Sequence, residues 1–119
     1  MKRTSDHHAE RCRELAPILI PALREVARRY GYALGVHGSL SYDIDLIACP
    51  WREGCTDQAT LAAAIQEAVR AIAGEAVSLK TDANPTHKPH GRLAWSFHMG
   101  GGPYVDLSVM PTMESTDGD

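Results

Sequence analysis

The chain has 119 residues, a length typical of one domain, and its 44% apolar and 23% charged residues are ordinary for a soluble globular protein. A formal net charge of −3 excludes a generally basic surface, so we expect no nucleic-acid partner. The polar N-terminus and the lack of any long apolar run predict neither a signal peptide nor a membrane span. Three cysteines without zinc-type spacing favour reduced thiols, and we predict a cytoplasmic protein. It would form one domain over residues 1–119, with flexible ends at residues 1–14 and 112–119.

The first predicted element is a helix over residues 5–30. Its apolar side chains recur at three- and four-residue steps, as on the buried face of a helix: Leu15, Leu19, Leu23, Val26 and Tyr30. Pro17 and Pro21 each lack an N–H group, so we expect a kink near the first of them. Gly31 is a typical residue to end such a helix.

Two short apolar runs, residues 33–36 and 44–48, are predicted as strands around a small polar turn. The second run carries Asp43 and Asp45. Because residues i and i+2 of a strand point to the same face, their carboxylates are expected side by side. Like charges raise each other's pKa unless a cation lies between them, and oxygen ligands of this kind suit Mg²⁺. On this motif alone, a solvated acidic pair at a strand edge is the alternative.

A second helix is predicted after a loop that contains Trp51, a residue we expect to cap the core, with the lining of a pocket as the alternative. Thr56 or Asp57 would cap the N-terminus of this helix, and Gly74 would end it. Its buried stripe is expected to contain Leu61, Ile65, Val69 and Ile72.

Three further strands are predicted over residues 76–80, 92–98 and 104–110, and the last two alternate cleanly between apolar and polar residues. The order of elements predicts an α+β domain in which helices cover one face of a small mixed sheet. The other face is expected to collect polar and ionisable side chains: Asp43, Asp45, Arg92, Ser96, His98 and Asp106.

A glycine-serine turn, an acidic pair and a later lone acid form one pattern along the chain: Gly38, Ser39, Asp43, Asp45 and Asp106. The pattern resembles the signature of the DNA polymerase beta-like nucleotidyltransferase superfamily. The chain also looks like minimal phage and bacterial members with a His-Gly-Ser run and a Lys-Pro-His-Gly-Arg run, here residues 37–39 and 88–92. The resemblance covers most of residues 30–111 and implies a nucleotidyltransferase-like fold.

The resemblance implies a Mg²⁺-dependent enzyme that transfers a nucleoside monophosphate from an NTP to a hydroxyl acceptor. Its catalytic and metal-binding residues would be Asp43, Asp45 and Asp106, which would hold two Mg²⁺ ions. Gly38 would let the backbone approach a phosphate, and Ser39 would hydrogen-bond a phosphate oxygen. These roles agree with the needs of phosphoryl transfer, which are charge neutralisation and in-line positioning.

Three basic residues at the mouth of the fourth strand are further candidates to bind phosphate: Lys88, His90 and Arg92. Arg92 shares a strand face with the acids, and guanidinium groups bind phosphate through two parallel hydrogen bonds. The alternative is a solvated loop with ordinary charges. We give no role to His7 and His8, which belong to the polar N-terminus.

Two other functions remain open at this stage. Only residues 40–42 separate the glycine-serine turn from the first acid, fewer than the superfamily usually has. This favours, as a second hypothesis, a catalytically silent module that binds a nucleotide, a protein partner or a second copy of the chain. The third is a metal-dependent hydrolase that uses the same acids, with His90 or His98 as the base.

Overall fold

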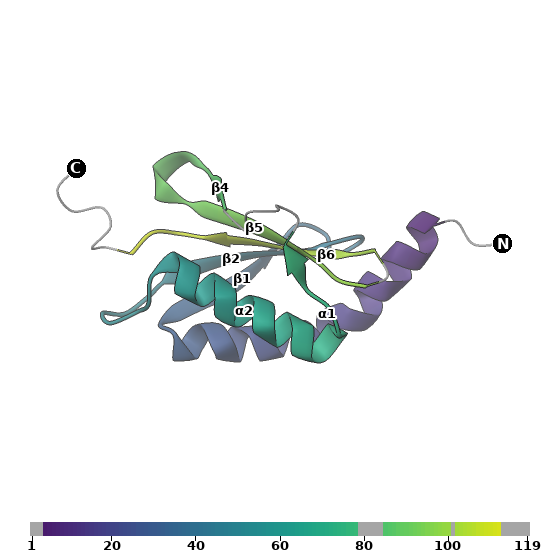
Figure 1. Ribbon diagram of the computed structural model, residues 1–119, viewed down its shortest axis with the longest axis horizontal. Helices are drawn as coiled ribbons and strands as arrows, with labels where there is room; N and C mark the ends of the chain where they lie inside the picture. Colours follow the sequence, from purple (N-terminus) through teal and green to yellow (C-terminus); the bar gives the residue numbers. More distant parts are fainter. Residues whose placement is uncertain (1–3, 79–84, 101, 113–119) are drawn as a thin grey trace.

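Two helices and a mixed β-sheet form two layers in the computed structural model, which describes residues 4–78, 85–100 and 102–112. In chain order the elements are α1 Thr4–Arg29, β1 Tyr32–His37, β2 Ile44–Pro50, α2 Gln58–Ala73, β3 Val77–Ser78, β4 Thr86–His87, the 3₁₀ turn η1 Pro89–Gly91, β5 Leu93–His98 and β6 Tyr104–Val109. Both helices lie on the same side of the sheet (Figure 1). The predicted α+β class, with helices on one face, is therefore confirmed.

The sheet has the strand order β1-β2-β6-β5-β3, and β4 also pairs with β5. Only β2 and β6 run parallel to each other among the described pairs; the others are antiparallel. This topology puts β6, the last strand in sequence, between β2 and β5. A late residue of the chain thereby becomes the direct neighbour of an early one.

Of the stripe that periodicity predicts in α1, Leu15, Leu19 and Leu23 are at most 5% exposed. Its last two members, Val26 and Tyr30, are only partly buried. Pro17 lies inside the helix, and the N-terminal part of α1 bends away from the axis of the remainder (Figure 1). A bend of this kind is what a proline without its N–H produces inside a helix. The helix begins at Thr4, whereas the predicted flexibility of residues 1–14 and 112–119 stays a prediction.

Helix α2 has well-defined caps at both ends. The Asp57 carboxylate accepts a hydrogen bond from the Thr60 N–H at 2.7 Å, and Gly74 takes a left-handed conformation at the C-terminal cap. Of the predicted stripe, Leu61, Ile65 and Val69 are buried, but Ile72 is 36% exposed. The prediction for Ile72 was wrong: this residue shares the angular position of the stripe but lies in the last turn of α2, where it is not covered.

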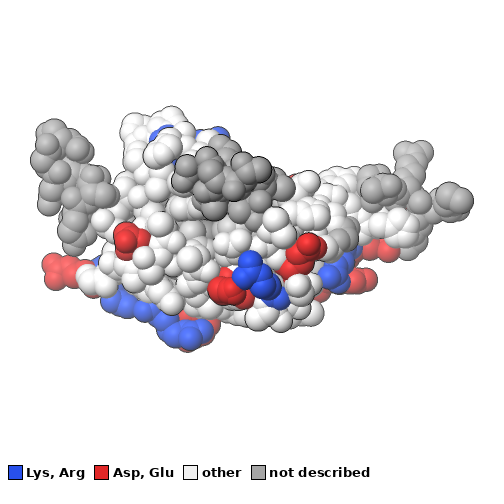
Figure 2. Space-filling view, viewed as in Figure 1, with Lys and Arg blue, Asp and Glu red and all other residues white. Residues whose placement is uncertain are grey.

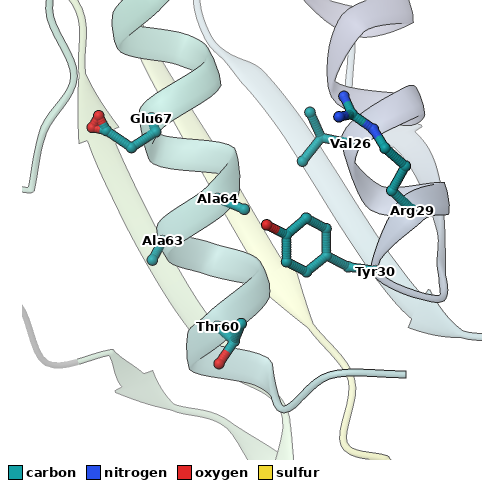
Figure 3. A pocket seen from close by; sticks show the side chains of 7 residues that line it. All are labelled: Val26, Arg29, Tyr30, Thr60, Ala63, Ala64 and Glu67. Carbon is teal, nitrogen blue, oxygen red and sulfur yellow. The ribbon is translucent and has the colours of Figure 1, made fainter. Parts of the chain in front are cut away.

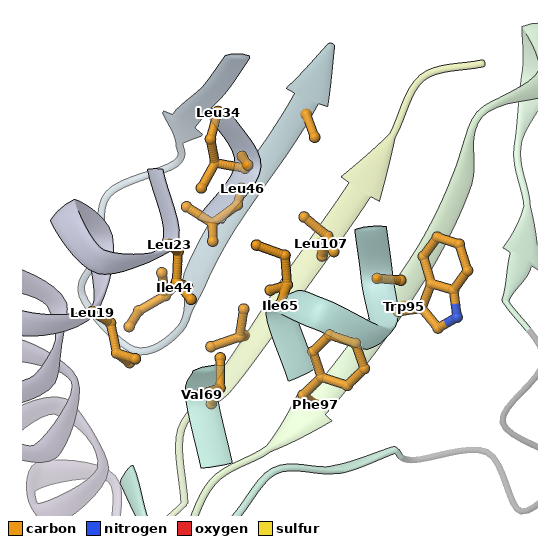
Figure 4. Close-up of a cluster of buried hydrophobic side chains, with 14 of the residues drawn as sticks. Leu19, Leu23, Leu34, Ile44, Leu46, Ile65, Val69, Trp95, Phe97 and Leu107 are labelled. Atoms are coloured by element: carbon orange, nitrogen blue, oxygen red, sulfur yellow. The ribbon is translucent and has the colours of Figure 1, made fainter. Parts of the chain in front are cut away.

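The core lies between the helices and one face of the sheet (Figure 4). Strand β5 contributes Trp95 and Phe97, and β6 contributes Val105, Leu107 and Val109, as their alternation predicts. Trp51, however, is 59% exposed in the loop after β2, so its predicted core role is wrong. The opposite, helix-free face of the sheet is left for the polar side chains of the same strands.

The outer surface of the helix layer carries charges of both signs, interspersed along its length (Figure 2). No helix among the described residues is long and apolar enough to span a membrane. Of the strand predicted over residues 76–80, Val77–Ser78 form β3. Residues 79 and 80 lie outside the described residues.

Candidate functional site

The turn between β1 and β2 brings Gly38 against the Asp45 side chain. Gly38 has a φ of +77°, and a Cβ at this position would lie 2.8 Å from Oδ2 of Asp45. Leu40 also has a positive φ, of 58°, so the turn is tightly bent. Ser39 is exposed, and its Oγ accepts a hydrogen bond from the Ser41 N–H at 3.3 Å. Glycine at position 38 therefore keeps one side of a carboxylate oxygen open.

Asp45 of β2 and Asp106 of β6 are direct neighbours on the helix-free face. The two strands are parallel and pair these residues in register, at a typical strand spacing of about 4.8 Å. On the other side of Asp106, Ser96 of β5 is its register partner, and the Ser96 hydroxyl donates to Asp106 Oδ1 at 2.6 Å. Ser96, Asp106 and Asp45 therefore form one row across three strands.

The pKa of Asp106 is raised above its ordinary value of 3.8, chiefly by burial. The hydrogen bond from Ser96 lowers this pKa, whereas hydrogen bonding to Asp45 and the negative charges of Asp45 and Asp43 raise it. Two like charges at this separation favour a proton or a cation between them. Among the described residues, no ion pair to Asp45 or Asp106 is seen, so the row brings two acidic side chains together.

Asp43 lies just before β2 and joins this pair electrostatically. Its Oδ1 accepts hydrogen bonds from His8 Nε2 at 3.1 Å and from the Tyr104 N–H at 3.0 Å. His8 comes from the first turns of α1, and Tyr104 opens β6. The fold thus gathers three aspartates, separated by up to 63 positions in sequence, at one end of the β2–β6 pair. We call this cluster of Asp43, Asp45 and Asp106 the acidic corner.

The donor set at this corner fits a hard divalent cation. Carboxylate oxygens are the ligands that Mg²⁺ prefers, and Gly38 leaves room beside Asp45 Oδ2. Within the described part of the chain, no group of three or more histidine, cysteine, aspartate or glutamate side chains has the arrangement of a complete metal site. The predicted set of Asp43, Asp45 and Asp106 therefore stays a prediction, with Asp45 and Asp106 as its facing pair.

The predicted phosphate-binding residues are spread more widely. Arg92 reaches the polar face, where its Nη1 donates to Ser108 Oγ at 2.9 Å. Lys88 and His90 are exposed around η1, near the point where Leu93 of β5 pairs with the end of β6. In the contacts that the structure describes, none of the three basic residues touches an aspartate of the site.

Two residues at the site were missed by sequence reasoning, His8 and Tyr104. The His8 ring centre lies 6.2 Å from that of Tyr104 and 6.1 Å from that of Tyr42. A signal for His8 was present: it precedes Cys12 by four residues and Leu15 by seven, so it lies on the buried face of α1. The helix predicted over residues 5–30 already contains His8, but its buried stripe was followed only from Leu15 onward.

A groove of about 560 Å³ runs between α1 and α2, on the helix layer (Figure 3). Tyr30 points into it, with Val26 and Arg29 on the α1 side and Ala63, Ala64, Thr60 and Glu67 on the α2 side. No candidate site residue lines it. The aspartates belong to the opposite, open face of the sheet, so this groove plays no part in the candidate site.

Comparisons with known proteins inform the fold. No family model and no curated protein matches the chain. Among solved structures, the Cid1 poly(U) polymerase with bound Mg 3'-dATP is similar at 15% identity and a TM-score of 0.53. The same enzyme with bound MgGTP is similar at 16% identity and a TM-score of 0.51.

These matches cover 84% of this chain but only 31% and 32% of the solved chains, so the protein spans about a third of their length. At this level of identity the likeness establishes the fold alone. Over most of its length, the chain has a nucleotidyltransferase-like fold.

Proposed function

We propose that the protein is a Mg²⁺-dependent nucleotidyltransferase that transfers a nucleoside monophosphate from an NTP to a hydroxyl acceptor. The observation that carries the proposal is the in-register pairing of Asp45 with Asp106 on adjacent parallel strands, with Asp43 beside them. The likeness of the fold to a poly(U) polymerase with bound Mg 3'-dATP supports it. That the chain is of the minimal phage and bacterial type stays a hypothesis.

The chain's own residues would divide the work as follows. Asp45 and Asp106 would bind the metal from two adjacent strands, and Asp43 would complete the ligand set. Bound Mg²⁺ would neutralise phosphate charge and help activate the attacking hydroxyl. Gly38 would admit a phosphate close to the backbone, and the exposed Ser39 hydroxyl would donate to a phosphate oxygen.

The basic residues would act further along the same face. Arg92 lies on the polar side of the sheet through its bond to Ser108, two residues beyond Asp106 on β6. From there its guanidinium group would bind a phosphate of the nucleotide or of the acceptor. Lys88 and His90, exposed at the end of β5, would contact only a longer substrate.

The experiment that tests the proposal is a transfer assay with α-labelled NTPs, Mg²⁺ and a panel of hydroxyl acceptors. Wild type is expected to transfer label and release pyrophosphate, and Asp45→Ala and Asp45→Asn are expected to lose both. Asp57→Asn is the matched control, because Asp57 is an acid outside the site and asparagine also caps helices well. Activity that survives in Asp45→Asn would overturn the proposal.

A silent binding module on the same fold is the second candidate. It is favoured by the short turn, since only residues 40–42 separate Ser39 from Asp43, and by the limited length of the chain relative to the solved polymerase. Such a module would bind a nucleotide, a protein partner or a second copy of itself. Calorimetry separates the two candidates: NTP binding without pyrophosphate release in the same sample supports the module.

A further inference from the structure

His8 is the residue of α1 that touches the acidic corner. Its Nε2 lies 3.1 Å from Asp43 Oδ1, and the pair is sheltered, with 22% of the His8 side chain and 32% of the Asp43 side chain exposed. The aromatic rings of Tyr42 and Tyr104 flank the imidazole edge-on. The imidazole therefore has an aromatic neighbour on two sides in addition to its contact with Asp43.

The surrounding contacts fix this end of α1 to the two turns that frame the site. Arg11 Nε donates to the Gly100 carbonyl at 3.2 Å, and the Cys12 thiol donates to the Leu40 carbonyl at 3.3 Å. A Cβ at Gly102 would lie 3.1 Å from His8 Nδ1, so the second turn closes against the imidazole. The helix thus sets where His8 lies relative to Asp43.

The hydrogen bonds to Asp43 have a specific geometry. Among the described residues, both donors to this carboxylate, His8 Nε2 and the Tyr104 N–H, reach the same oxygen, Oδ1. A carboxylate held by one oxygen has a fixed plane and leaves its other oxygen, Oδ2, available to a cation. Residues that hydrogen-bond a metal ligand in this way orient it, and their loss typically lowers metal affinity by about 10–100-fold.

We propose that His8 is a positioning residue, which orients the Asp43 carboxylate so that Oδ2 contributes to binding a divalent cation at the Asp45–Asp106 pair. The inference rests on the proposed function, because it takes the aspartates as the metal ligands. It adds a part of the site that lies in α1, about 30 positions before the glycine-serine turn. It also assigns a purpose to the bent N-terminal part of α1, which carries the histidine to the corner.

The test measures divalent-cation affinity directly, without turnover, using Mn²⁺ and Mg²⁺ on the full chain. The variants are His8→Leu, which removes the donor, His8→Gln, whose amide nitrogen replaces Nε2, and His7→Gln as the control on the exposed neighbour. His8→Leu is expected to weaken Mn²⁺ binding by about 10–100-fold. His8→Gln should recover most of this loss, and His7→Gln should bind as wild type does.

A double variant separates orientation from general damage to the fold. If His8 acts through Asp43, the loss from His8→Leu should largely vanish when it is measured in an Asp43→Asn background. Thermal unfolding without metal identifies a purely structural role, in which the melting temperature falls in His8→Leu while Mn²⁺ affinity stays at the wild-type value. That result overturns the proposal and leaves the proposed function intact.

The same titration distinguishes failure of the proposed metal site from failure of the positioning role of His8. Wild type that binds neither Mn²⁺ nor Mg²⁺ refutes the metal site of the proposed function, and the role of His8 falls with it. Should His8→Leu destabilise the fold too far for titration, His8→Asn serves instead, because its polar but shorter side chain does not reach the carboxylate. Wild-type affinity in His8→Asn would overturn the positioning role.

Discussion

Replacing Asp106 by asparagine should stabilise the metal-free protein and abolish its stabilisation by Mg²⁺. Asp106 and Asp45 face each other on adjacent strands, about 5 Å apart, where two charges at an effective dielectric constant of about 20 repel by about 3 kcal/mol. Both side chains are partly exposed, so we expect solvent to reduce the gain to about 1–2 kcal/mol. Asparagine keeps an oxygen that accepts from the Ser96 hydroxyl, and the local structure should be preserved.

Thermal unfolding in EDTA and across a Mg²⁺ titration measures both effects. In EDTA, Asp106→Asn should melt roughly 4–8 °C above wild type. With Mg²⁺, wild type should gain stability with the logarithm of metal concentration, by about 2.7 kcal/mol at 100 times its Kd, while the variant gains almost none. Asp45→Asn should behave alike, and the double variant should add little because the pair repulsion is lost only once.

If Asp106→Asn is less stable than wild type in EDTA, the acidic pair is favourable without a cation, and the predicted repulsion is refuted. A variant that retains the full Mg²⁺ shift would show that the cation binds elsewhere. Either result would remove the physical basis for a metal site at this corner.

Three further perturbations test the framework around the site. Gly38→Ala places a methyl group at a φ of +77° and 2.8 Å from Asp45 Oδ2. It should lower the free energy of unfolding in urea by about 1–2 kcal/mol and weaken Mn²⁺ binding. Gly35→Ala is the control: its Cβ would lie 3.7 Å from the nearest neighbour, so Mn²⁺ binding should not change. Asp57→Ala removes the N-terminal cap of α2 and should cost about 1 kcal/mol near neutral pH. Because the Thr60 hydrogen bond lowers the pKa of Asp57, this contribution is complete above the ordinary value of 3.8 and is lost as pH falls through the lower folded-state pKa, so unfolding curves of the two proteins should converge in acid. Ile65→Ala should cost about 2–5 kcal/mol and Ile72→Ala less than about 1 kcal/mol in the same assay, because Ile65 is fully buried and Ile72 is 36% exposed.

Periodicity predicted the elements of the fold because burial follows the helix and strand repeats directly. The stripe at Leu15, Leu19 and Leu23 and the alternation of β5 and β6 both report which side chains face the core. The same logic placed Asp45 and Asp106 on one face. It did not reveal that they are register partners, because the insertion of β6 between β2 and β5 depends on pairings among distant segments.

The sequence predictions that were wrong concern residues at the ends of elements, where local pattern and tertiary packing diverge. Ile72 continues the spacing of the α2 stripe, but it lies in the last turn of the helix and stays 36% exposed. Trp51 is apolar and large, yet it sits in a loop after β2 and stays exposed. His8 shows the reverse case, a polar residue on the buried face of a helix, which a composition-based view of the N-terminus overlooked.

The chemistry of the corner is common to the two functional hypotheses. Three aspartates gather at a partly buried position, and in the described contacts the neighbouring Arg92 bonds a serine and not a carboxylate. Because burial and mutual repulsion both disfavour this arrangement of charges, a cation from solution is the simplest compensation. A nucleotidyltransferase and a silent nucleotide-binding module would both need that cation, so metal binding does not separate them. Metal affinity therefore tests the site, and only product formation at a metal-loaded site tests whether the short turn still supports transfer.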